Sequence, residues 1–335
     1  MSLFSPVKTG LHIGKDYLSF AILKPSGRTL QIVYSIHILL TKNSVRHSPI
    51  DQNILNVEEI EEHLKKIHSD FPKIRAISLS LPDLSARMIL IEVRNRIPPL
   101  NELNQMIKWN MEQKFILKIG DSRFSHQLIS HSRHGQTKDG RENGSKKYFS
   151  LLGIAILKNI LAEYENLPIS FHLVPKMINN VSLNLFNFYH DFLFKTASAG
   201  NFLFLSVLDN YFTLMVYEKG ILQYIRTVGL RLAENGVESA QEEAGENNRQ
   251  KIINHIESVL PYHFLNPQSK SEIQVFITGL SDLPKEILEF GDHYQLKVLL
   301  LRPAMVTSLE GVGKISDREM NKLLPAIAAA ADALN

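Results

Sequence analysis

The sequence predicts an α/β protein of two repeated halves, and two observations support this prediction. Three short apolar strands joined by tight turns open the chain, and the same arrangement returns near residue 202. Each set of strands is followed by segments with apolar residues at helical spacing and then by further buried strands. The alternation of strands and helices indicates an α/β architecture.

In the first half, turn residues and apolar alternation define the elements. Pro25 and Gly27 favour a turn because proline fixes φ and glycine reaches positive φ. Residues 29–40 place apolar side chains on alternate positions, which is typical of a half-buried strand. The expected elements are strands at residues 10–14, 17–23, 29–40 and 74–81 and a helix at residues 57–68.

The rest of the chain is interpreted in the same way. Residues 84–172 are expected to hold strands at 88–93, 123–131 and 148–156 and helices at 100–117 and 157–166. A helix at 179–194 precedes the second half, for which we expect strands at 202–208, 211–217, 221–228, 273–279 and 297–301 and helices at 252–265 and 283–290. Pro325 is expected at the first position of a last helix, because that position needs no amide hydrogen.

Composition excludes several classes of protein. The chain has 335 residues, a net charge of +3 and no cysteine, which excludes disulfides, thiolate nucleophiles and cysteine-ligated metals. Its apolar runs are far shorter than the ~18 residues that span a bilayer. The first residues lack the layout of a signal peptide, so we expect a cytoplasmic protein. The positive excess is spread along the chain, and no nucleic-acid partner is expected.

The residues alone do not predict an enzyme. The 13 histidines show no metal-ligand spacing, so no metal site is expected. Walker A, Gly-x-Gly-x-x-Gly and Gly-x-Ser-x-Gly patterns are absent. No other set of nucleophile, base and acid residues emerges, so no catalytic residue is expected and enzymatic activity stays uncertain.

The repeat itself suggests a fold. Two α/β halves, each opening with a three-stranded meander, are the layout of the actin-like (ribonuclease H-like) duplicated fold. Six segments then resemble, in order, the family of the type IV pilus assembly protein PilM, which is related to the cell-division protein FtsA and more distantly to the cytoplasmic part of the type II secretion protein GspL. These segments are residues 10–14, 76–83, 103–115, 152–155, 220–228 and 277–284.

The resemblance implies a division of the chain. Residues 84–172 would be the inserted subdomain, called 1C, that FtsA and PilM carry. The first actin-like half (1A) would comprise residues 1–83, 173–198 and the C-terminal helix 320–335. The second half (2A) would comprise residues 199–230 and 270–319, with residues 231–269 as a reduced 2B-type subdomain.

The resemblance also implies where ATP would bind. Gly14, Lys15, Thr213 and Gly279 match or adjoin the phosphate and adenosine turns of the family. However, His12 and Ser206 stand at the positions of its two Asp residues, and Leu208 stands at a Gly position. We therefore expect a degenerate site that binds ATP and Mg²⁺ weakly or not at all, so that no cofactor is needed. The alternative is that His12, Thr213 and Gly279 have only structural roles.

A partner site is implied as well. PilM-like proteins bind the short tail of the single-span membrane protein PilN in a cleft between the first half and the inserted subdomain. Met106, Trp109 and Phe115, on the helix at 100–117, are the candidate apolar anchors. Alternatively, Trp109 packs in the core of its own subdomain.

Two functions therefore remain. The first is an adaptor or scaffold, peripheral at the inner membrane, that contacts a PilN-like tail and other components of a pilus or secretion complex. The second is an active actin-like ATPase of the same machinery. Self-association is left open.

Overall fold

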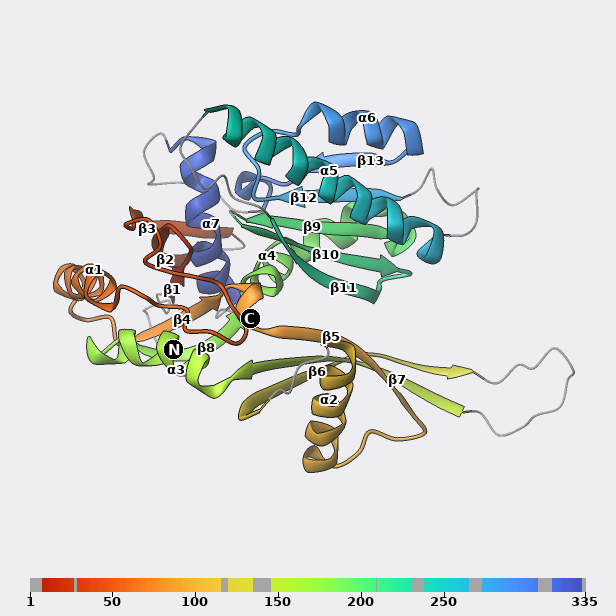
Figure 1. Ribbon diagram of the computed structural model, residues 1–335, viewed down its shortest axis with the longest axis horizontal. Coiled ribbons are helices and arrows are strands. Elements are labelled where there is room, and N and C mark those ends of the chain that lie inside the picture. Colours follow the sequence, from red (N-terminus) through yellow and green to blue (C-terminus); the bar gives the residue numbers. More distant parts are fainter. Residues whose placement is uncertain are drawn as a thin grey trace, which may run out of the picture.

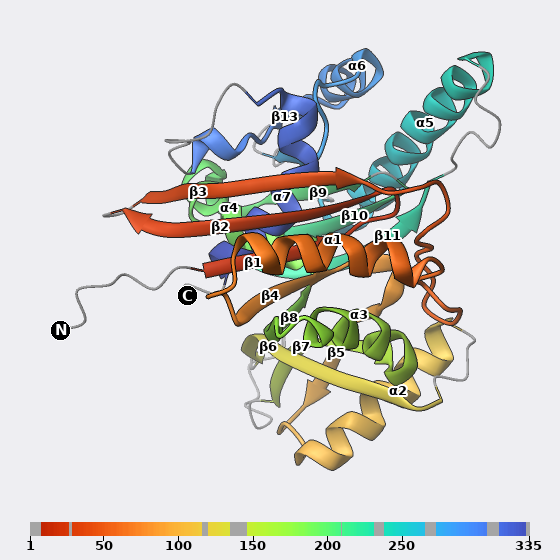
Figure 2. The same ribbon diagram turned by 90° about the vertical axis from the view of Figure 1, so that its left-hand side faces the viewer.

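The computed structural model describes residues 8–26, 29–115, 120–134, 146–208, 210–230, 238–264, 273–306 and 315–332. These residues form two five-stranded sheets, one three-stranded sheet and the helices that cover them (Figures 1 and 2). Figure 1 shows the second half of the chain at the top, the first half at the left and a smaller lobe below.

The sheet of the first half has the strand order β3-β2-β1-β4-β8. Its strands are β1 (Lys8–Ile13), β2 (Tyr17–Ser26), β3 (Thr29–Leu39), β4 (Ala76–Leu81) and β8 (Val174–Asn180). The first three strands are antiparallel, and β4 and β8 are added in parallel. Helices α1 (Val57–Asp70) and α3 (Lys158–Ser170) pack their apolar faces on this sheet.

The sheet of the second half has the equivalent order β11-β10-β9-β12-β13. Its strands are β9 (Phe202–Leu208), β10 (Tyr211–Glu218), β11 (Ile221–Gly229), β12 (Gln274–Thr278) and β13 (Lys297–Leu300). Again the meander is antiparallel, and the last two strands are parallel to β9. The equivalence of the two meanders that the sequence predicts is therefore confirmed. Helices α5 (Glu238–His263) and α6 (Lys285–Tyr294) cover the outer face.

The lobe is a three-stranded antiparallel sheet of order β5-β7-β6 with one helix on it. It consists of β5 (Arg87–Arg94), α2 (Leu100–Phe115), β6 (Ser122–His134) and β7 (Lys146–Leu157). Leu103, Ile107 and Met111 of α2 are buried against one face of this sheet. Although α3 falls within residues 84–172, its buried side chains belong to the core of the first half.

Two helices lie between the large sheets, namely α4 (Val181–Thr196) and α7 (Asp317–Asp332). The C-terminal helix α7 packs on β1 and β2 through the buried residues Ala326, Ile327, Ala330 and Ala331. Gly10 makes this approach possible, because a β-carbon there would overlap the carbonyl oxygen of Ala326. Short 3₁₀ turns occur at Asp83–Ser85, Ser198–Gly200 and Pro303–Met305.

Three elements differ from the sequence prediction. The seven residues of β8, which precede α4, were not expected to be a strand, because Val-Pro-Lys-Met-Ile-Asn-Asn has neither alternation nor a β-branched run. Helix α5 begins well before residue 252. The placement of Pro325 is wrong: α7 begins eight residues earlier, where the Ser316 hydroxyl accepts the Glu319 N–H and the Glu319 carboxylate accepts the Ser316 N–H.

Candidate functional site

Equivalent polar side chains stand at the inner ends of the central strands of both halves. His12 on β1 is paired in register with Ser19 on β2 and Ser80 on β4. At the equivalent positions, Ser206 on β9 is paired with Thr213 on β10 and Thr278 on β12. All six side chains are buried. These six buried side chains are called the polar seam below, and each position needs its own account.

His12 is neutral in the folded protein. Its Nδ1 lies 2.9 Å from the carbonyl oxygen of Ser80. A carbonyl only accepts, so Nδ1 carries the hydrogen and Nε2 is the bare nitrogen. Burial lowers the pKa of His12 to about 4, against the smaller opposing effect of this hydrogen bond. His12 therefore offers no negative charge to a divalent cation at neutral pH.

Gly14 and Lys15 lie in the turn between β1 and β2. The Gly14 N–H donates to the Tyr17 carbonyl at 2.8 Å and closes this turn. A β-carbon on Gly14 would come within 2.7 Å of the Tyr17 ring, so a larger residue here would require that ring to move. Lys15 is half-buried in the same turn. A role for both residues in binding phosphate stays a prediction.

Thr213 and Gly279 also have structural roles. The Thr213 hydroxyl donates to the Oδ2 of Asp83 at 2.7 Å, across the boundary between the two halves. Gly279 has φ +90°, and a β-carbon there would overlap the carbonyl oxygen of Val207. The turn after β12 thus needs a glycine for its own backbone approach. The structure brings Thr213 to the polar seam, whereas Gly279 contacts the end of β9.

Two further residues join the halves, and sequence reasoning missed both. Besides its contact with Thr213, the carboxylate of Asp83 accepts the Ser182 N–H at 3.2 Å. Burial raises the pKa of Asp83 to about 6, although its hydrogen bonds act in the opposite direction. His47 places Nδ1 3.0 Å from Oδ1 of Asn210, and burial lowers its pKa to about 3. Asp83 and Thr213 are 130 residues apart in sequence, and His47 and Asn210 are 163 residues apart. A local sequence motif therefore cannot predict either contact.

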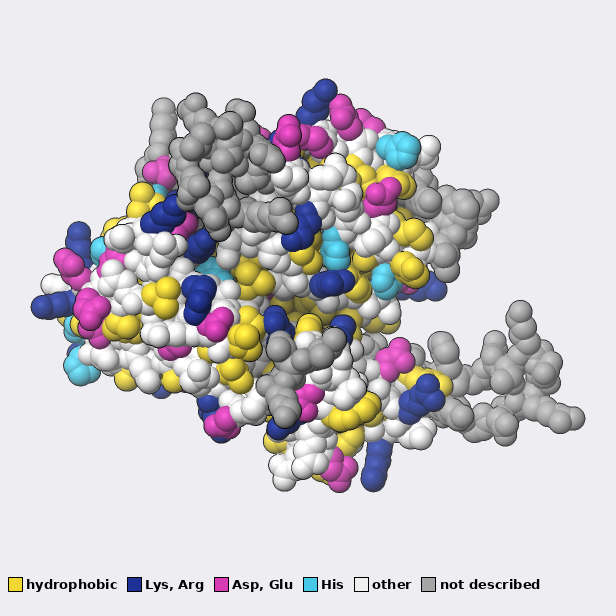
Figure 3. Space-filling view, in the orientation of Figure 1, with side chains coloured by type: hydrophobic (Ala, Val, Ile, Leu, Met, Phe, Trp, Pro, Cys, Tyr) yellow, Lys and Arg dark blue, Asp and Glu magenta, His cyan; other side chains and the backbone are white. Residues whose placement is uncertain are grey.

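Basic side chains gather at the front of the boundary between the second half and the lobe. Figure 3 shows Lys, Arg and His side chains on both sides of this recess. Arg226 on β11 lowers the pKa of Lys114 on α2, together with the larger effect of burial. Arg226 also contributes, after burial, to the lowered pKa of His255 on α5. Arg226 is therefore close enough to Lys114 and His255 for their charges to interact, and together these side chains would attract an anion.

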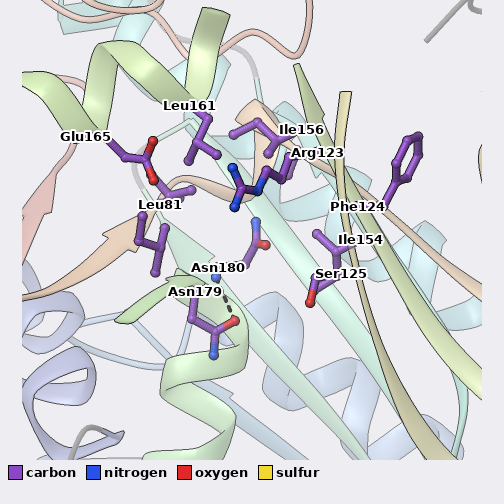
Figure 4. Close-up of a pocket in the computed structure, with 12 residues that line it drawn as sticks. Leu81, Arg123, Phe124, Ser125, Ile154, Ile156, Leu161, Glu165, Asn179 and Asn180 are labelled. Carbon is purple, nitrogen blue, oxygen red and sulfur yellow. Dashed lines mark hydrogen bonds between the residues drawn. The ribbon is translucent and has the colours of Figure 1, made fainter. Parts of the chain in front are cut away.

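A cavity of 360 Å³ lies on another side of the molecule, between the first half and the lobe (Figure 4). Its walls come from the ends of β4 and β8, from α3, and from β6 and β7. Apolar and polar residues line it: Leu81, Ala86, Phe124, Ile154, Ile156, Leu161 and Ile178, with Arg123, Ser125, Glu165, Asn179 and Asn180. Asn180 is 3% exposed, and its side chain lies near the Asp83 carboxylate, whose pKa it lowers against the larger effect of burial. A largely apolar wall with a few polar side chains suits a peptide.

The predicted anchors on α2 do not line this cavity. The helix covers the opposite face of the lobe sheet, where Ile107 packs against Gly153. Met106 and Phe115 are partly buried against the lobe core, and Arg87 lies over the Phe115 ring. Trp109 is 61% exposed, so the alternative that it packs in the lobe core is wrong. The three residues form a second candidate surface, separate from the cavity.

Two wider classes of site can be addressed for the part of the chain that the structure describes. There, no group of three or more His, Asp or Glu side chains is arranged to hold a metal ion. None of the described helices has the length and apolar character needed to cross a membrane.

Comparison with known proteins shows the fold. No family model matches the chain, and no curated protein matches it in sequence. A solved structure of the PilM–PilN type IV pilus biogenesis complex is similar over 98% of this chain and 98% of its own, with a TM-score of 0.74 and 13% identity. A protein of Bacteroides thetaiotaomicron with an actin-like ATPase fold and unknown function is similar over 95% of both chains, with a TM-score of 0.52 and 11% identity. The chain therefore has the actin-like fold that its repeat predicted.

Proposed function

We propose that the protein is a scaffold of a pilus or secretion-type assembly at the inner membrane, and that it binds the short cytoplasmic tail of a single-span membrane protein. The observation that carries this proposal is the cavity between the first half and the lobe. The similarity in fold to a protein solved as a PilM–PilN complex makes a PilN-like tail the first partner to test. Other inner-membrane components would then assemble on the same scaffold.

The chemistry of the cavity supports a peptide as its ligand. Its volume of 360 Å³ lies within the range of small ligand sites. Isoleucine and leucine side chains from four different elements form an apolar wall, so that an apolar side chain would be desolvated there.

We further propose that this function does not use ATP. An actin-like ATP site needs a carboxylate near Mg²⁺ and glycine backbone near phosphate. Here His12 is a neutral imidazole, and the Tyr17 ring covers Gly14. The Asp83 carboxylate is engaged by Thr213 and Ser182. Side chains thus hold the two halves together where a nucleotide would otherwise do so.

The tail proposal is tested by titrating a labelled peptide with the sequence of a PilN-like cytoplasmic tail. Ser125→Trp inserts a bulky side chain at an exposed position of the cavity and should weaken binding at least tenfold. Tyr262→Ala, at an 80% exposed position of α5, is the control and should bind like the wild type. If Trp109→Ala abolishes binding while Ser125→Trp does not, the partner site is the α2 surface and the assignment to the cavity is refuted.

The second candidate function is an ATP-binding protein of the same machinery. The basic recess around Arg226 and Lys114 favours it, because phosphates would be attracted there. Calorimetry with Mg-ATP separates the two functions. We expect a dissociation constant no tighter than roughly millimolar, about −4 kcal/mol, whereas a specific micromolar site would give about −8 kcal/mol. Micromolar binding that Arg226→Glu weakens would establish the second function.

A further inference from the structure

The cavity between the first half and the lobe runs along an unpaired strand edge. Strand β6 is the outermost strand of the lobe sheet, because the order is β5-β7-β6. Three consecutive residues of this strand, Arg123, Phe124 and Ser125, line the cavity. Figure 2 shows β6 at the outside of the lobe, below α3.

Consecutive residues of a strand point to opposite faces of its sheet. They can border one cavity together only if that cavity follows the edge of the strand and contacts its backbone. Figure 4 agrees, because the Phe124 side chain points away from the other labelled residues while Arg123 points among them. The N–H and C=O groups on the outer side of this edge are therefore available to another chain.

Strand β8 offers a second edge on the far side of the cavity, through Ile178, Asn179 and Asn180. This edge is less suited to accept a strand. The Asn180 N–H already donates to Oδ1 of Asn179 at 2.9 Å, and Pro175 has no amide hydrogen. Between Ser122 and Leu128, β6 contains neither proline nor glycine. Of the two edge strands, β6 is the one whose backbone can form hydrogen bonds with an added strand.

We infer that the tail binds by strand addition, as a fourth strand on the outer edge of β6. This inference rests on the proposed function and adds the chemistry of recognition to it. Alternate side chains of the added strand face the apolar wall formed by Ile154, Ile156 and Leu161. The side chains between them face the other side of the sheet. The tail is thus recognised as an extended segment with apolar residues at every second position.

The probe for this inference is a displayed library of seven-residue peptides, selected on the whole protein and then resynthesised. We retain the peptides that bind the wild-type protein and whose affinity for the Ser125→Trp variant is at least tenfold lower. Gln127→Trp is the matched control, because Gln127 is exposed on the same face of the same strand, two residues beyond the cavity lining. We expect it to change affinity less than twofold.

N-methylation of each peptide backbone nitrogen in turn then tests strand addition. We expect losses of at least tenfold at alternate positions and less than twofold between them, with slowed hydrogen exchange of alternate amides in β6. A peptide that needs the cavity but tolerates N-methylation at every position overturns strand addition and leaves the proposed function standing. If no peptide distinguishes Ser125→Trp from the wild type, both the strand addition and the cavity as the tail site are refuted.

Discussion

Acid should destabilise the folded protein because two of its histidines are buried. The pKa of His12 is lowered to about 4 and that of His47 to about 3, in both cases mainly by burial. In the unfolded chain a histidine titrates near 6.5. Between these values the unfolded state binds protons that the folded state does not. Stability is therefore complete above pH ~6.5 and is lost as the pH falls toward the folded values.

The magnitude follows from the same pKa values. At pH 5 each of the two histidines costs about 2 kcal/mol of folding free energy relative to neutral pH. Asp83 acts in the opposite direction, because its pKa is raised to about 6, so the folded state takes up its proton first. Protonation of Asp83 therefore raises the free energy of unfolding by about 1 kcal/mol at pH 5. The three groups together should thus lower the free energy of unfolding by about 3 kcal/mol between pH 7.5 and pH 5.

Urea unfolding at pH 7.5, 6 and 5 measures this effect. The variant His12→Gln/His47→Gln is expected to be less stable than the wild type at pH 7.5, since two packed rings are replaced, but to lose far less on acidification. The exposed His293 on α6 provides the control, and His293→Gln should keep the acid sensitivity of the wild type. A double variant with the same pH dependence as the wild type would refute the reasoning, whatever its stability at pH 7.5.

Three other predictions concern packing. Gly10→Ala should destabilise the protein by about 3 kcal/mol, because the new methyl meets the backbone of α7, whereas Gly120→Ala, with open space around it, should be nearly neutral in the same thermal melt. Thr213→Val should cost about 1–3 kcal/mol by leaving the buried Asp83 without its hydroxyl donor, and Thr213→Ser should recover most of that loss in urea unfolding. Trp109→Ala should leave the melting temperature within about 1 °C of the wild type, since surface substitutions change stability little; a drop of several degrees would contradict the exposure of that side chain.

The strands of the two meanders could be predicted from sequence because their apolar alternation and turn residues are local signals. β8 could not, since its polar residues become a strand only through parallel pairing with β4. The start of α7 was missed although Ser316 and Glu319 form a capping box that the sequence displays.

The candidate site was predictable only in part. His12, Ser206 and Thr213 could be placed at strand ends from the repeat alone. The contacts between the halves could not be predicted. Asp83 contacts Thr213, and His47 contacts Asn210, only when the two halves are packed together. The neutral state of His12 likewise depends on burial among residues distant in sequence.

The packing of α7 on β1 and β2 has a consequence for biosynthesis. The first sheet begins at Lys8, yet the helix that covers it ends at Asp332. At about 5–20 residues per second, a ribosome needs roughly 15–60 s to make the stretch between them. Throughout this interval the apolar face formed by Ala21, Leu23 and Ile32 has no cover. The second half, continuous from Phe202 to Leu300, can complete its own sheet earlier. We therefore expect the opening strands to stay partly uncovered until the last helix is made.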